Sequence, residues 1–179
     1  HYALGISQNS SGSDASAAAS WEMAIQLDPS FSLAYKSLAM LHYSTGKRDT
    51  AFQVLEKAVG NNPDGQTYKA LGNLYLLNHR FEHAAETLQK SIGLAPGDAE
   101  TLSNLGTALR RIGRLDDAQK AYENAIELQS DNAVLHHNLG GVRLQMKDKR
   151  GALIAFERAA ELGSTNIQTF LSLGRLYLD

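Results

Sequence analysis

The sequence contains no cysteine, only three prolines and almost no net charge, and each shortage excludes a class of structure or function. Without cysteine there is no disulfide, no thiolate metal site and no cysteine nucleophile. No run of about 18 apolar residues occurs, so a membrane-spanning helix is not predicted. The formal charge of −2 provides no overall field that would draw the chain to nucleic acid or to an anionic membrane. The scarcity of proline favours helices.

Motifs for catalysis and cofactor binding are also missing. The sequence has no Walker-type phosphate loop, no GxGxxG after a strand and no HExxH pair. His79 and His83 flank a predicted turn, and the adjacent His136 and His137 would point about 100° apart on a helix. A basic stripe with interleaved aromatic residues, typical of nucleic-acid binding, is absent. We therefore predict a protein that is not an enzyme and that binds no metal, cofactor or nucleic acid.

The sequence repeats with a period of 34 residues, shortened once to 33. One column of small residues follows a leucine each time: Gly5, Ala39, Gly72, Gly106, Gly140 and Gly174. A second column, of large apolar residues, keeps the same spacing: Trp21, Leu55, Leu88, Tyr122 and Phe156. Repetition at such a period is typical of solenoids built from small supersecondary units. The single deletion falls between Pro63 and Tyr68, in a turn between units, where chain length matters little.

Each period contains two helical patterns separated by a turn. In the third unit, a helical face around Gly72 is followed by a break at residues 78–80 and by a second helix over about Phe81–Leu94. Helices of about 12 to 14 residues are marginal alone in water, so packing must hold them. We expect Gly72 and Ala84 to let the two helices approach closely, and Leu88 to fill the space between neighbouring hairpins.

These residues carry a family resemblance that covers essentially the whole chain. The pattern consists of Tyr68, Leu71, Gly72 and Tyr75, followed by Ala84, Leu88, Ser91 and Pro96. It resembles the tetratricopeptide repeat (TPR) family, with Ser130 and Ser164 in place of the closing proline. The resemblance implies an all-α fold, a right-handed superhelical solenoid of antiparallel helix hairpins, in which the first helix of each hairpin lines a concave surface.

The period divides the chain into a series of units. They are 1–31, a partial first repeat that starts inside its first helix, then 32–64, 65–98, 99–132 and 133–166, and finally 167–179, the first helix of a truncated repeat. We interpret the chain as part of a longer array, because the last helix, about Ile167–Leu178, is apolar on too many sides for a terminal cap. The same face predicts end-to-end self-association. The sequence is compatible with both cytoplasm and periplasm.

The register of the repeats predicts which residues face the concave groove. The peptide-binding candidates are Lys36, Lys69, Asn73, Asn104, Thr107, Arg110, His137, Asn138 and Arg175. Met40, Leu76 and Glu100 fall on the same predicted face. Four of these positions are basic and one is acidic, so the wall is expected to be locally basic although the whole chain is slightly acidic. We therefore expect a protein or peptide partner with acidic side chains or a carboxylate group.

Two finer interpretations follow from the resemblance. Lys69, Asn73 and Asn104 match three of the five positions of the carboxylate clamp of chaperone adaptors, but Val134 and Asn138 stand where lysine and arginine are expected. Alternatively, Asn104 and Asn138 occupy the same site in successive repeats and form two rungs of an asparagine ladder. Long TPR superhelices, such as that of O-linked N-acetylglucosamine transferase, bind peptide backbones with such ladders. A solvated asparagine without a partner explains the same pattern.

The first functional hypothesis is a non-catalytic protein–protein interaction module, which binds an extended peptide or a helix of a partner in its concave groove. Two alternatives belong to other classes. In one, the chain is the substrate-recruiting or regulatory arm of a larger enzyme, such as a glycosyltransferase. In the other, it is a self-assembling structural scaffold of a secretion or envelope system. All three use the same fold, so the sequence leaves them open.

Overall fold

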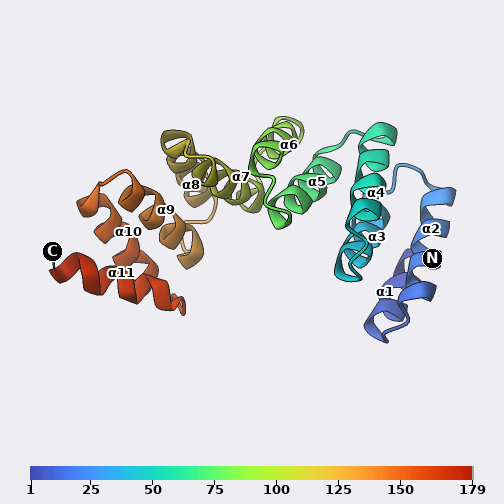
Figure 1. Cartoon of the computed structure of the whole chain (residues 1–179), viewed down its shortest axis with the longest axis horizontal. Helices are drawn as coiled ribbons and strands as arrows, with labels where there is room; N and C mark the ends of the chain where they lie inside the picture. Colours follow the sequence, from blue (N-terminus) through green and yellow to red (C-terminus); the bar gives the residue numbers. More distant parts are fainter. Residues whose placement is uncertain (179) are drawn as a thin grey trace.

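A computed structural model of the chain describes residues 1–178, which form eleven α-helices and no strand. The helices are α1 (Tyr2–Ser10), α2 (Asp14–Leu27), α3 (Ser32–Ser44), α4 (Arg48–Asn61), α5 (Gly65–Leu77), α6 (Phe81–Leu94), α7 (Ala99–Arg111), α8 (Leu115–Leu128), α9 (Ala133–Gln145), α10 (Lys149–Glu161) and α11 (Ile167–Leu178). The two helices whose limits were predicted, α6 and α11, are confirmed with the same bounds. The chain runs as an arch from α1 at one end to α11 at the other (Figure 1).

Consecutive helices pack as hairpins, α1 with α2 and so on to α9 with α10, and α11 packs against α10. Neighbouring hairpins meet where the second helix of one contacts the first helix of the next, as α6 does with α7. First helices also touch one another, α3 with α5, α5 with α7, and α7 with α9, on the inner side of the arch (Figure 1). The predicted all-α solenoid of helix hairpins is thus confirmed, and its first helices form one wall.

The glycine column brings the two helices of each hairpin into contact. A Cβ atom at Gly72 would lie 2.6 Å from Cγ of Leu88, and one at Gly106 would lie 2.9 Å from the ring of Tyr122. Leu88 and Tyr122 are fully buried, so neither can move aside into solvent. The predicted close approach is confirmed. The large apolar residues of the second column were expected between neighbouring hairpins. Leu88 and Tyr122 also pack against the glycine of their own hairpin, because a residue without a side chain leaves room there.

The turns inside the hairpins share one backbone geometry. Gly46 and Gly113 both have a φ angle of 81°. At the matching turns, His79 and Lys147 also have positive φ angles, of 58° and 65°. A residue with a Cβ atom is disfavoured in this left-handed region, and glycine is not. The predicted break at residues 78–80 is confirmed, and two of these four turns contain a residue that is strained there.

The shortened period corresponds to the connection between α4 and α5, which has only residues 62–64. Asp64 ends this connection and caps α5, because one carboxylate oxygen accepts from the Thr67 backbone N–H at 2.6 Å. Its other oxygen accepts from the Ser32 hydroxyl at the start of α3. Burial raises the pKa of Asp64, but these hydrogen bonds outweigh it and lower the pKa below its ordinary value. Asp64 therefore ties the second hairpin to the third across the short connection.

Candidate functional site

Three cavities follow the wall formed by the first helices. The first, of about 410 Å³, lies along α1 and α3 and includes Ser37 and Met40. The second, of about 370 Å³, lies between α3, α5 and α7. The third, of about 240 Å³, lies between α7 and α9 and includes Ser103 and Val134. The second cavity combines a large apolar surface with several of the predicted site residues, so it is the main candidate site.

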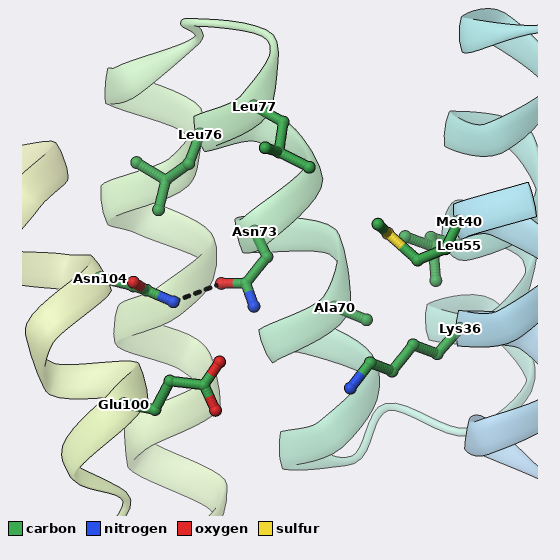
Figure 2. A pocket seen from close by; sticks show the side chains of 9 residues that line it. All are labelled: Lys36, Met40, Leu55, Ala70, Asn73, Leu76, Leu77, Glu100 and Asn104. Atoms are coloured by element: carbon green, nitrogen blue, oxygen red, sulfur yellow. Dashed lines mark hydrogen bonds between the residues drawn. The ribbon is translucent and has the colours of Figure 1, made fainter. Parts of the chain in front are cut away.

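The lining of the central cavity is partly apolar and partly polar (Figure 2). Its apolar side chains are Met40, Leu55, Ala70, Leu76 and Leu77. Its polar side chains are Lys36, Asn73, Glu100 and Asn104. Lys36 extends from α3 and Glu100 from α7, on opposite sides of α5 (Figure 2). Three residues predicted from different repeats, Lys36, Asn73 and Asn104, therefore line one cavity.

Asn73 on α5 and Asn104 on α7 are joined by a hydrogen bond, in which Nδ2 of Asn104 donates to Oδ1 of Asn73 at 2.9 Å (Figure 2). Each side-chain amide carries both donors and an acceptor. Whichever amide donates to the other, the pair keeps one NH₂ group and one carbonyl oxygen with capacity for further bonds. These are the two kinds of partner that a peptide unit of a ligand requires.

Lys69 does not line this cavity, because its ammonium group is held by two carboxylates. Nζ lies 2.7 Å from Oδ2 of Asp98 and 2.6 Å from Oε2 of Glu100. Burial lowers the pKa of Lys69, but the bonds to these two carboxylates raise it more, so its pKa lies above its ordinary value. The positive charge of Lys69 is therefore balanced within the protein. The wall carries less free positive charge than the count of basic residues indicated.

Thr107 and Arg110 lie on α7 and His137 lies on the neighbouring α9, and none of the three lines the third cavity. The Thr107 hydroxyl donates to the Ser103 carbonyl at 3.0 Å and lies 2.8 Å from the Tyr122 hydroxyl. Burial raises the pKa of Tyr122, and the Thr107 hydroxyl and the charge of Arg110 oppose that rise. Burial and the charge of Arg110 both lower the pKa of His137. The charge of Arg110 therefore acts on both Tyr122 and His137.

The remaining predicted residues do not join either group. Asn138 is partly buried on α9, and within residues 1–178 it has no hydrogen-bond partner, so it makes no ladder contact to Asn104. Val134 and Arg175 are exposed. Sequence reasoning missed Leu55, because it was assigned to the core column, and it missed Leu77, which is 47% exposed at the end of α5.

Among residues 1–178, no cluster of three or more His, Asp or Glu side chains could hold a metal ion. No helix in this range combines the length and the apolar character that crossing a bilayer requires.

The stacked hairpins, with cavities along one wall of first helices, define the class of α-helical solenoid repeat proteins. Within that class, the chain belongs to the tetratricopeptide repeat family. One tetratricopeptide repeat family model matches residues 2–66 and again 38–99, and a second matches residues 97–164. The sequence-based recognition of TPR repeats is thus confirmed. No curated protein matches the chain in sequence.

Solved structures with the same fold cover nearly the whole chain. PilF of Pseudomonas aeruginosa is 19% identical, with a TM-score of 0.85 over 99% of this chain and 81% of that chain. MamA of AMB-1 is 25% identical, with a TM-score of 0.77 over 90% and 96%. YrrB, described as a TPR protein with an unusual peptide-binding site, is 20% identical, with a TM-score of 0.79 over 96% and 89%. Family and fold together define a protein-interaction module, of a kind that is typically non-catalytic and binds protein or peptide partners.

Proposed function

We propose that this protein binds an extended peptide segment of a partner protein along its concave wall, with the central cavity as the main contact. The observation that carries the proposal is that apolar side chains and the hydrogen-bonded Asn73–Asn104 pair line the same cavity. An extended peptide presents a side chain and a free peptide unit side by side, because its side chains alternate between two faces. The side chain would enter the cavity while the two asparagines bond the backbone.

The central cavity by itself is expected to contribute only a few kcal/mol of binding free energy. Burying one large apolar side chain is worth about 1.5–3 kcal/mol, and each net hydrogen bond about 0.5–1.5 kcal/mol. Association also loses freedom of motion in both partners, which offsets several kcal/mol of these gains. One cavity alone therefore gives weak binding, and the ligand is expected to gain affinity from further contacts along the wall.

The test compares two leucines of nearly equal exposure. Leu77 lines the central cavity and is 47% exposed, while Leu128 at the end of α8 lines none of the described cavities and is 48% exposed. Random peptides displayed on phage are selected on the full chain, and the selected peptides are synthesised with a fluorescent label. Their dissociation constants are then measured by anisotropy for the parent, Leu77→Glu and Leu128→Glu.

We expect Leu77→Glu to weaken binding at least tenfold, because about one apolar contact is lost and a charge must be desolvated. Leu128→Glu should change the dissociation constant by no more than about twofold, since exposed substitutions rarely matter. Circular dichroism of both variants controls for loss of helix. Equal affinities for the two variants would place the site elsewhere, and a selection that yields no peptide would refute peptide binding by this wall.

A further inference from the structure

We propose that Arg110 is the anchor for a carboxylate group of the bound ligand, at a second contact point between α7 and α9. This inference rests on the proposed function, because it assumes that a peptide runs along the same wall. It adds a chemical requirement to the ligand, which must present an acidic side chain or a C-terminal carboxylate a short distance from the residue held by the central cavity.

The first argument is the missing counter-ion of Arg110. Three cationic side chains in residues 1–178 are partly buried: Lys69, Arg110 and Arg143. Lys69 is paired with Asp98 and Glu100, and Arg143 is paired with Glu123 at 2.9 Å. Arg110 has no carboxylate partner anywhere in the described range. A charge that is partly withdrawn from water without a partner is unfavourable, so the environment of Arg110 is completed when an anion binds.

The second argument is the shape of the space around the guanidinium. Its Nε is enclosed and has no hydrogen-bond partner, so the side chain is held against the protein rather than swinging in solvent. A Cβ at Gly141 on α9 would lie 3.4 Å from Nη1 of Arg110. The glycine therefore lets the guanidinium approach the α9 backbone, where most side chains would crowd it. An arginine held in this way has lost most of its rotamer freedom before a ligand arrives.

The neighbours of Arg110 leave its charge unbalanced, although the Tyr122 hydroxyl accepts a hydrogen bond from its guanidinium. The Thr107 and Tyr122 hydroxyls bond each other, and Nδ1 of His137 lies 2.8 Å from Oγ1 of Thr169 on α11. None of these groups is negatively charged. His137 also packs its ring on Phe156, so it forms a fixed side of the space. The site thus consists of one cation with neutral polar neighbours, which suits a ligand with a single negative charge.

A carboxylate fits this arrangement better than a phosphate. Arg110 carries one positive charge, so a doubly charged phosphate would leave one negative charge unbalanced next to the partial negative charge at the end of α7. One guanidinium can hold one carboxylate through two parallel hydrogen bonds.

The experiment uses an array of random peptides of one fixed length, synthesised both with a free C-terminal carboxylate and with a C-terminal amide. The full chain is compared with Arg110→Gln, Arg110→Lys and Arg150→Gln. Arg150 is a matched control, because it is exposed on α10 and has no ion pair among the described residues. Circular dichroism verifies the helix content of each variant, and Arg110→Lys decides the outcome if Arg110→Gln loses helix.

The parent chain should select peptides enriched in a carboxylate. Arg110→Gln should bind them at least roughly tenfold more weakly, since a hydrogen bond to a charged group is lost. The affinity of Arg110→Lys should lie between those of the parent and of Arg110→Gln, because lysine keeps the positive charge but lacks the planar guanidinium group. Arg150→Gln should stay within about twofold of the parent, as expected for an exposed charge. Loss of binding on amidation would identify the C-terminus as the source of the carboxylate, and retention would identify an acidic side chain.

Selected peptides without acidic enrichment, or equal binding by the parent and Arg110→Gln, would overturn the assignment of Arg110. If those peptides still depended on Leu77, the proposed function would stand and only this inference would fail. If Leu77→Glu also left their binding unchanged, both would fail. An array that yields no binding peptide would overturn both together.

Discussion

Gly106→Ala tests how closely the helices of one hairpin must approach. The added methyl group would lie 2.9 to 3.0 Å from three ring atoms of Tyr122. That ring is fully buried, and its hydroxyl is held by Thr107 at 2.8 Å, so it cannot rotate away without losing contacts. Overpacking of this kind destabilises by about 1–3 kcal/mol, while alanine gains up to about 1 kcal/mol over glycine inside a helix. The net loss should be about 0–2 kcal/mol.

A control variant measures the stability gained from the higher helix propensity of alanine, without the steric cost. Gly93 lies in α6, and a Cβ there would meet nothing within 4 Å. Gly93→Ala should therefore stabilise by about 0.5–1 kcal/mol from propensity alone. The two variants should then differ by about 1–3 kcal/mol, which isolates the steric effect of Tyr122.

The assay is urea unfolding followed by circular dichroism, with all variants measured at one temperature. For a chain of this length, 1 kcal/mol shifts the melting temperature by about 2–4 °C, so thermal melts give a second readout. The double variant Gly106→Ala/Tyr122→Leu recreates the small–large pair formed by Ala39 and Leu55, and it should lose less stability than the sum of its single changes. If Gly106→Ala were as stabilising as Gly93→Ala, the close-contact account of the hairpin would be wrong.

Two further predictions concern the turns and pH. Lys147→Gly should raise the free energy of unfolding by about 0.5–1 kcal/mol in urea titrations, because it relieves the positive φ, whereas Gly113→Ala at the matching turn should lower it. An unchanged midpoint for Lys147→Gly would show that this turn carries no strain. Burial lowers the pKa of His42 and of His137 from the ordinary 6.5, helped by the charges of nearby Lys47 and Arg110 respectively. As pH falls below 6.5 the unfolded chain therefore takes up protons first, and stability decreases. A His42→Gln/His137→Gln variant should lose less stability between neutral and mildly acidic pH, and equal slopes for variant and parent would contradict this reasoning.

The electrostatics of the wall show why the candidate site was only partly predictable. The positions of Lys36, Lys69, Arg110 and Arg175 follow from the register, and they indicated a basic surface. The ion pair of Lys69 with Asp98 does not follow from the register. Asp98 is the N-cap residue of α7, and the distance between Asp98 and α5 depends on how the two hairpins stack. The same stacking left Arg110 without a carboxylate.

The sequence by itself determined the repeat, the helix hairpins and the family, because periodicity, glycine positions and helix breaks are local properties of the chain. The limits of α6 and the close approach of the two helices at Gly72 followed from spacing alone. Only the tertiary structure decided where the wall is hollow and which charges are free. Both depend on distances between helices of different repeats, and small rotations between hairpins set these distances without any signal in the period. The central cavity and the Asn73–Asn104 bond are therefore properties of the stacked array.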